Sequence, residues 1–153
     1  MTDAGYRSGC DYCRWARDGL PGGWLYEDEF WCIGTYSHQV MPGIVIQLKR
    51  HLEGVGEIGD AEWVALGPMI GAVSRAMESE KAIERVYVVS FCETHRHRHF
   101  LVTPLARDVP AESRGWALWD HVTSAAGGYD PLRQPDVKAR VFDAVRLELV
   151  RRH

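Results

Sequence analysis

The sequence feature that most constrains the fold is a run of three histidines between two apolar segments. His95-Arg96-His97-Arg98-His99 separates residues 86–91, which are rich in β-branched and aromatic side chains, from Phe100–Thr103. Both apolar segments predict strands, and alternate side chains of an extended chain share one face. The three imidazoles are therefore expected to line one surface, with the two arginines opposite. A solvated sheet edge would show the same alternation, but the position between two apolar strands favours a functional surface.

The remaining hydrophobic pattern predicts an α+β fold with a mainly antiparallel sheet of about five strands. Besides the two segments that flank the histidines, strands are predicted over residues 24–27, 31–36 and 44–48. One long helix is predicted from Asp60, which can cap it. Its apolar stripe consists of Trp63, Leu66, Ile70, Val73 and Met77. A terminal helix is predicted from about Asp136, with an apolar residue every four positions at Val137, Val141, Val145 and Leu149.

A length of 153 residues predicts a single domain, residues 1–153. We divide it into a core over about 10–105, an irregular flap over 106–134 with at most one short helix, and a C-terminal helix over 135–153. The strand after the histidines is expected to stop at Pro104, because proline cannot donate a hydrogen bond to a neighbouring strand.

Composition limits the partners and the environment of the protein. A net charge of −3 and a pI near 6.1 argue against a protein that coats nucleic acid, but not against one that binds a small anion. We find no apolar run long enough to predict a membrane span. The N-terminal residues lack the basic and apolar regions of a secretory signal. Four cysteines without such a signal fit a cytoplasmic protein that carries free thiols or metal ligands.

Two further segments carry side chains that can bind a metal. Cys10-x-x-Cys13 has the spacing of a zinc-binding pair, but a structural site needs four ligands and no second pair follows. A redox pair and coincidence stay open as alternatives, and redox use is the weakest because the motif does not open a helix after a strand. Lys49-Arg50-His51 follows a predicted strand and would, alone, be a solvated strand end. The isolated Cys32 and Cys92 are interpreted as buried small hydrophobic residues.

In their order along the chain, these segments resemble the histidine-triad (HIT) superfamily. That order is Cys-x-x-Cys, a strand followed by Lys49-Arg50-His51, an amphipathic helix, and a strand-His-x-His-strand-Pro segment. Pro42-Gly43, Ala65-Leu66-Gly67-Pro68 and Val88-Val89-Ser90-Phe91 are also similar to the bacterial members that contain zinc. The resemblance covers Cys10 to about Leu105, and it implies a HIT-like α+β fold that forms homodimers.

The triad can be aligned in two registers. The family pattern places an apolar residue after each histidine and usually ends on Pro-Arg. We prefer to align Val102-Thr103-Pro104-Leu105 with that end, which assigns the triad to His97, His99 and Leu101. The other register uses His95, His97 and His99 but leaves the apolar segment before the proline too long. In the preferred register the Leu101 side chain cannot form a hydrogen bond, and Arg96 and Arg98 must reach solvent or an acidic partner.

The preferred register implies roles for eight residues. One structural zinc ion would be bound by Cys10, Cys13, His51 and His97. His99 would attack the α-phosphorus of a nucleoside phosphate and form a covalent phosphohistidine, while its other ring nitrogen bonds to a backbone carbonyl. Substrate would be bound by Thr94, His95 and Arg96. The resemblance thus implies a nucleoside phosphate hydrolase, with a nucleotidyl transferase or a catalytically weak nucleotide-binding module as alternatives.

Overall fold

The computed structural model describes residues 5–36, 41–124 and 129–152. Its centre is a five-stranded antiparallel sheet in the order β1-β2-β3-β5-β4. The strands are β1 (Tyr26–Glu27), β2 (Trp31–Gly34), β3 (Ile44–Leu48), β4 (Ile83–Val89) and β5 (His99–Ala106). The α+β fold and the mainly antiparallel sheet of five strands are therefore confirmed.

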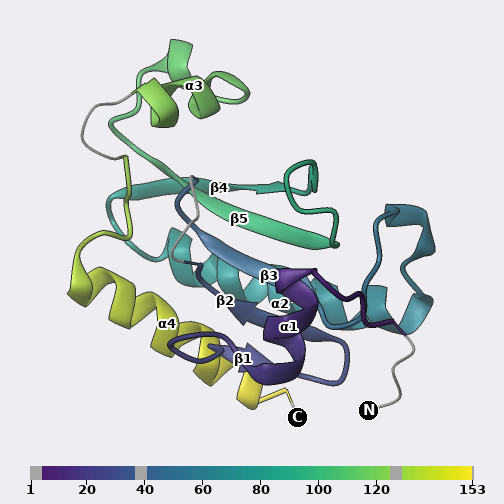
Figure 1. Cartoon of the computed structure of the whole chain (residues 1–153). Helices are drawn as coiled ribbons and strands as arrows, with labels where there is room; N and C mark the ends of the chain where they lie inside the picture. The colour runs from purple at the N-terminus through teal and green to yellow at the C-terminus, as the bar shows by residue number, and fades with distance from the viewer. Residues whose placement is uncertain (1–4, 37–40, 125–128, 153) are drawn as a thin grey trace.

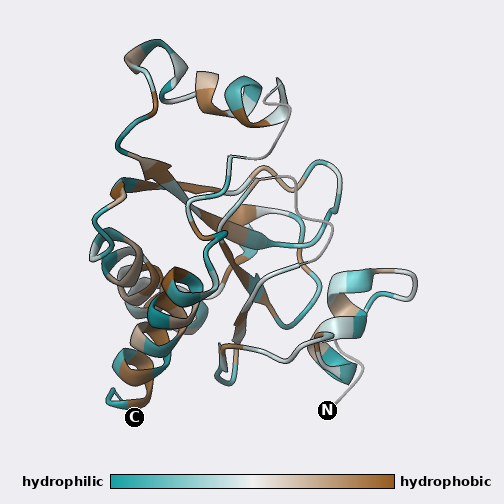
Figure 2. Cartoon of the chain, turned by 90° about the vertical axis from the view of Figure 1, so that its left-hand side faces the viewer, coloured by the Kyte–Doolittle hydropathy of each residue, from teal (hydrophilic) through white to brown (hydrophobic). Residues whose placement is uncertain are grey.

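Helices cover both faces of this sheet (Figure 1). They are α1 (Asp11–Asp18), α2 (Asp60–Glu78), α3 (Ala117–Ser124) and α4 (Pro135–Val150), with short 3-10 turns η1 (Val55–Glu57) and η2 (Ala111–Ser113). Figure 2 shows the paired α2 and α4 on one side of the sheet and α1 on the other. Among the residues that the structure describes, no helix is both long and apolar enough to span a membrane. The sequence analysis missed α1 altogether.

The main hydrophobic core lies between the sheet and the α2–α4 pair. Alternate strand residues point into it, including Ile33, Ile44, Ile46, Leu48 and Val102. The helices contribute Leu66, Met69, Val73 and Met77 from α2 and Val141, Val145 and Leu149 from α4. The predicted stripes are thus correct in period, but Trp63 remains 40% exposed at the edge of the core.

Strand β5 continues through Pro104, so the prediction that it stops there is wrong. The register explains why proline is tolerated. Val102 is the last β5 residue paired with β3, whereas Pro104 pairs only with Val86 on β4. On the side that β3 has left, the Tyr129 hydroxyl donates to the Pro104 carbonyl and accepts from the Ala106 amide. A residue's N and C=O point to the same side of a strand, so proline removes no ladder hydrogen bond here.

Helix α2 begins one residue earlier than the predicted cap implies. Gly59 is the N-cap and Asp60 is the first helical residue. The buried Glu62 carboxylate accepts a hydrogen bond from the Gly59 amide at 2.7 Å and two from the Arg50 guanidinium at 2.6 and 2.8 Å. These contacts tie the start of α2 to the segment that follows β3, which carries His51.

This ion pair predicts a pH dependence of stability. Arg50 lowers the pKa of Glu62 below its ordinary value of 4.5, with help from the Gly59 amide and against the effect of burial. A lowered folded-state pKa stabilises the protein fully above pH 4.5, and this contribution disappears as pH falls through the folded pKa. We expect Glu62→Gln to lower the free energy of unfolding by about 1–2 kcal/mol at pH 7. In denaturant titrations the difference from the native chain should shrink below pH 4.5; a constant difference would contradict this assignment.

Gly43 allows β3 to begin directly against β5. Its φ is +145°, and a Cβ atom at this position would lie 2.3 Å from the Val102 carbonyl oxygen. Because that oxygen belongs to the backbone of a central strand, it cannot move aside. We expect Gly43→Ala to lower the free energy of unfolding by about 2–4 kcal/mol in denaturant titrations. Gly67→Ala is the matched control: Gly67 lies inside α2 with no atom near its added Cβ, so alanine should stabilise the helix slightly.

Candidate functional site

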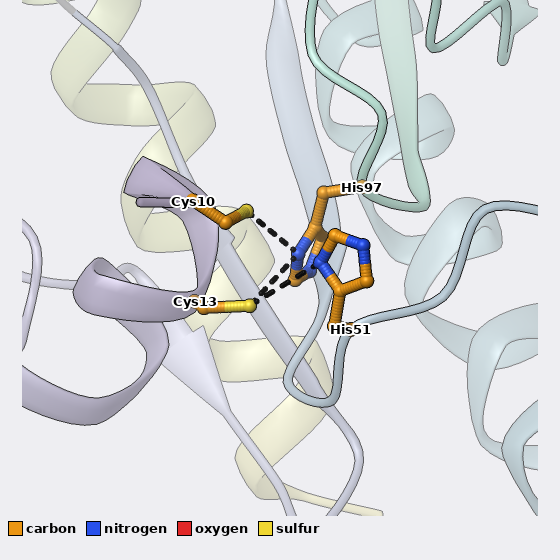
Figure 3. A group of neighbouring side chains, drawn as sticks. All are labelled: Cys10, Cys13, His51 and His97. Atoms are coloured by element: carbon orange, nitrogen blue, oxygen red, sulfur yellow. Dashed lines mark hydrogen bonds between the residues drawn. The ribbon is translucent and has the colours of Figure 1, made fainter. Parts of the chain in front are cut away.

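Helix α1 carries two cysteines to the histidine segment (Figure 3). Cys10 is the N-cap of α1 and Cys13 lies in its first turn, so the motif opens a helix, but among the described residues no strand precedes that helix. Cys10 Sγ and Cys13 Sγ each lie 3.4 Å from His97 Nδ1, and Cys13 Sγ also lies 3.4 Å from His51 Nδ1. Cys13 and His97 are almost fully buried.

The four side chains have the donor set and the spacing of a tetrahedral zinc site. Their ligand atoms all lie within 4.8 Å of one another. Zn–S bonds of about 2.3 Å and Zn–N bonds of about 2.0–2.1 Å place tetrahedral S and N ligands roughly 3.6 Å apart, close to the observed 3.4 Å. Within residues 5–36, 41–124 and 129–152 this is the one group of three or more such side chains that could hold a metal ion. The residues present therefore fit zinc.

Burial keeps the His97 imidazole neutral and opposes ionisation of the Cys13 thiol. It lowers the pKa of His97 to about 4, so the imidazole is neutral and able to bind a metal at pH 7. It also raises the pKa of Cys13 to about 11, although the amide of Arg7 donates to the sulfur. The Cys13 proton is thus one that a bound metal ion would displace, which makes metal affinity dependent on pH.

The ring nitrogens that face away from the cysteines also have defined partners. His97 Nε2 lies 2.7 Å from the Leu48 carbonyl oxygen, so it carries the proton and leaves the Nδ1 lone pair directed at the sulfurs. His51 Nε2 lies 3.6 Å from Glu53 Oε1 and 3.2 Å from Arg7 Nη1. Hydrogen bonding to Arg7 lowers the pKa of Glu53 and keeps this carboxylate ionised beside the His51 ring. Contacts at Nε2 therefore orient both rings so that Nδ1 points toward the cysteines.

His99 is the first residue of β5 and lies outside the four-residue cluster. Its Nδ1 is 2.7 Å from the His97 carbonyl oxygen, which assigns the proton to Nδ1 and the lone pair to Nε2. The half-buried ring stacks on Tyr12, with centroids 4.8 Å apart and planes 25° apart. A stack covers the face of an imidazole, whereas the lone pair lies in the ring plane. The stack alone therefore leaves the Nε2 edge open to a reacting atom.

Tyr12 connects the cysteine pair to all three histidines. It lies on α1 between Cys10 and Cys13, and its ring centroid is 5.3 Å from that of His95, 5.4 Å from that of His97 and 4.8 Å from that of His99. The sequence analysis did not identify this residue. The only available signal was its position inside Cys-x-x-Cys, because the contacts depend on how α1 lies over the sheet.

The three candidate substrate-binding residues line a cavity of about 440 Å³ beside the cluster. The segment that leads into α1 also lines this cavity, with Arg7 and Ser8 among its residues. His99 is not among the residues that line this cavity. The structure thus brings Thr94, His95 and Arg96 together beside the cluster, and Cys10 and His51 of the cluster also line this cavity.

Two arginines of the histidine run behave differently. Arg96 is exposed and lies 3.7 Å from Glu53, in agreement with the expected acidic partner. Arg98 is only 6% exposed, and its guanidinium donates to the Glu53 and Ser90 carbonyls and to the Ser90 hydroxyl rather than to a carboxylate among the described residues. Its Nε is buried without a partner. Backbone oxygens can satisfy a guanidinium as acceptors, which the expectation overlooked.

Cys92 is buried, as predicted, but it is not surrounded only by apolar groups. Its Sγ lies 3.5 Å from His99 Nδ1. Burial is the largest single effect and would raise the pKa of this thiol, but the hydrogen bonds and charge of His99, together with the Ser90 hydroxyl, lower it below its ordinary value. The sequence gives no signal for this contact, because residues 92 and 99 approach each other only through the turn between β4 and β5.

Comparisons with known proteins place this geometry in a known fold. No protein-family model matches the chain, and no curated protein matches its sequence. The chain is similar in structure to a zinc-bound histidine triad family protein from Mycobacterium smegmatis, with a TM-score of 0.62, 15% identity, and coverage of 95% of this chain and 98% of that one.

Two other solved structures show the same similarity. One, a hypothetical histidine triad nucleotide-binding protein from Sulfolobus tokodaii, has a TM-score of 0.58 and 15% identity over 93% of each chain. The other, a HIT family hydrolase from Clostridium thermocellum, has a TM-score of 0.52 and 20% identity over 68% of this chain and 96% of that one. The chain therefore has the fold of these proteins.

Proposed function

We propose, starting from the histidine-triad fold of this chain, that it is a hydrolase of nucleoside phosphates in which His99 is the nucleophile. The observation that carries the proposal is the hydrogen bond from His99 Nδ1 to the His97 carbonyl, at 2.7 Å. It leaves Nε2 unprotonated, and an imidazole attacks phosphorus through an unprotonated nitrogen. The nucleotide-binding and hydrolase descriptions of two structural neighbours support the same substrate class.

The proposed reaction has two displacements. In the first, the His99 Nε2 lone pair forms a bond to the α-phosphorus while the bond from phosphorus to the leaving group breaks. The leaving group departs with that electron pair and takes up a proton from water. In the second, water attacks the phosphohistidine, the P–N bond breaks, and the nucleoside monophosphate leaves with the water oxygen. Division into two steps is the gain from covalent catalysis.

The four-residue cluster has a structural role in this proposal. Zinc bound by Cys10, Cys13, His51 and His97 would act as a cross-link between α1 and the start of β5. Tyr12 lies on the cross-linked helix and stacks on His99. The cluster therefore positions the ring of the nucleophile.

Thr94, His95 and Arg96 are proposed to bind the phosphate-bearing part of the substrate. Their cavity adjoins the chain just before His97, and transition-state charge on phosphoryl oxygens needs donors that are already in place. A hydroxyl, an imidazole and a guanidinium are suitable donors. The half-buried Trp15, stacked on Tyr36 with centroids 4.8 Å apart, provides an aromatic surface near Tyr12 on which a nucleobase could stack.

The proposal is tested by single-turnover experiments with a nucleoside 5′-phosphoramidate and with a dinucleoside polyphosphate. We expect release of the nucleoside monophosphate and a transient protein-bound phosphoryl group that is labile in acid and stable in base, as a phosphoramidate bond should be. Product formation with no trapped intermediate under rapid quench would argue against the covalent step. Binding of both ligands without any product would argue against hydrolysis.

One observation favours a second candidate, a nucleotide-binding module with little or no turnover. The third triad position is Leu101, whose side chain cannot exchange hydrogen bonds with substrate or leaving group. Leu101 packs instead against the apolar and aromatic clusters on the α1 face of the sheet. Calorimetric binding of a nucleoside monophosphate with no product in the single-turnover experiment would support this candidate.

A homodimer is part of the proposal. Strand β4 is at the edge of the sheet, and within the described part of the chain it pairs with β5 alone. On α2, Val64 is 76% exposed and Trp63 is 40% exposed, so two neighbouring apolar side chains of this helix face solvent. A second copy could cover these residues and pair with β4. Solution scattering that gives a monomer mass at high concentration would count against the dimer.

A further inference from the structure

Cys92 lies directly against the ring of the proposed nucleophile. Its Sγ is 3.5 Å from His99 Nδ1 and 3.6 Å from the His99 carbonyl oxygen. The side chain is buried, and it belongs neither to the four-residue cluster nor to the residues that line the cavity. This thiol therefore contacts the reactive residue without being part of the machinery described above.

The backbone of Cys92 adopts a conformation that favours glycine. Its φ is +55°, and among the residues that the structure describes it is the one non-glycine residue with a positive φ. An L side chain raises the free energy of this conformation, and strain of this kind is concentrated at functional sites. Glycine would fit the turn between β4 and β5 with less strain. The backbone conformation at this position therefore does not explain why a cysteine is present there.

Ser90 and Arg98 hold the surroundings of this contact in place. Ser90 Oγ donates to the His99 carbonyl at 2.6 Å and accepts from Arg98 Nη1 at 2.9 Å. Ser90 Oγ also lies 3.7 Å from Cys92 Sγ. The serine therefore fixes the backbone of His99, and the buried arginine fixes the serine, while the cysteine is the member of this group that contacts the imidazole.

We propose that Cys92 is a positioning residue for His99, a role that rests on the proposed function of that histidine. The Nδ1–H group is shared between the His97 carbonyl at 2.7 Å and the Cys92 sulfur at 3.5 Å. A flipped ring would lose both acceptors, so the pair keeps Nε2 outward. When Nε2 bonds to phosphorus, positive charge spreads to Nδ1, and the polarisable sulfur lies beside it. Leu101 can supply neither effect.

The decisive variants are Cys92→Gly and Cys92→Ser. Glycine removes the sulfur and relieves the strain at φ +55°, so the variant is expected to fold at least as well as the native chain. With a nucleoside phosphoramidate we expect kcat to fall about tenfold and KM to change less than about twofold, since the contact gains strength only as charge develops on the ring. Serine retains an acceptor at this place, and it should recover most of the lost kcat.

A spectroscopic readout keeps the test independent of turnover. In nitrogen-resolved NMR spectra His99 of the native chain should show the Nδ1–H tautomer, and Cys92→Gly should shift its ring nitrogens toward a mixture of tautomers. The proposal is overturned if Cys92→Gly keeps both the native kcat and the native nitrogen shifts of His99. It is also overturned if kcat falls while those shifts stay native and Cys92→Ser fails to recover kcat. If the native chain has no turnover but the shifts change in Cys92→Gly, the hydrolase proposal fails and the positioning role stands.

Discussion

His99→Ala should lose at least about a thousandfold of the phosphoramidate hydrolysis rate and keep its zinc content. The loss is large because this variant has no atom that can form the covalent intermediate, so the remaining reaction depends on substrate binding alone. Stability should change little, because His99 is half-buried at the start of β5 and lies outside the four-residue cluster. The measurement is single-turnover kinetics together with metal analysis and a denaturant titration of the same preparation.

His95→Ala is the matched control for this prediction. His95 also packs against Tyr12, with ring centroids 5.3 Å apart. It precedes His97 by two residues and does not belong to the four-residue cluster. As a proposed substrate-binding residue, it should affect KM more than the rate of the covalent step. A His95→Ala variant that loses the trapped intermediate, while His99→Ala still forms it, would refute the assignment of His99.

His97→Ala should lose both the metal and much of the stability. The side chain contacts both cysteines and the Leu48 carbonyl from a fully buried position. A metal that binds only the folded chain, at a concentration a thousand times its Kd, stabilises it by about 4 kcal/mol. We expect metal analysis to give about one zinc per native chain and almost none for the variant, with a loss of free energy of unfolding of about this size.

A chelator should reproduce the effect in the native chain. Removal of zinc is expected to lower the denaturation midpoint of native protein and to leave that of His97→Ala unchanged. It should also slow hydrolysis, because α1 and Tyr12 are then held less firmly against His99. Native protein that is purified without chelator and contains no zinc would contradict the structural-zinc assignment, as would a His97→Ala variant with a full equivalent of zinc.

The sheet and the main helices could be predicted from local pattern alone. A strand that is buried throughout, such as β3, is visible in the sequence as a short apolar run, and an amphipathic helix such as α4 is visible as apolar residues at a fixed period. Alternation along an extended chain likewise predicts that His97 and His99 share a face. These features depend on residues close together in the chain, so no knowledge of packing was needed.

Contacts between distant segments were decided only by the tertiary structure. The polar sequence of α1 has no long apolar stripe to predict a helix, and its stability depends on packing over β5, which also places Tyr12 on the histidines. Pro104 is tolerated because the pairing of β5 with β3 stops at Val102, which lies opposite the first residue of β3.

The partners of the buried Arg98 and Cys92 also could not be predicted from the sequence. The alternation predicts Arg98 on the side opposite the histidines, but it could not predict that carbonyls of Glu53 and Ser90 would accept its hydrogen bonds. Nor could it bring Cys92 to His99. Periodicity determines the face on which a side chain lies, whereas its partner depends on which loops the fold closes around it.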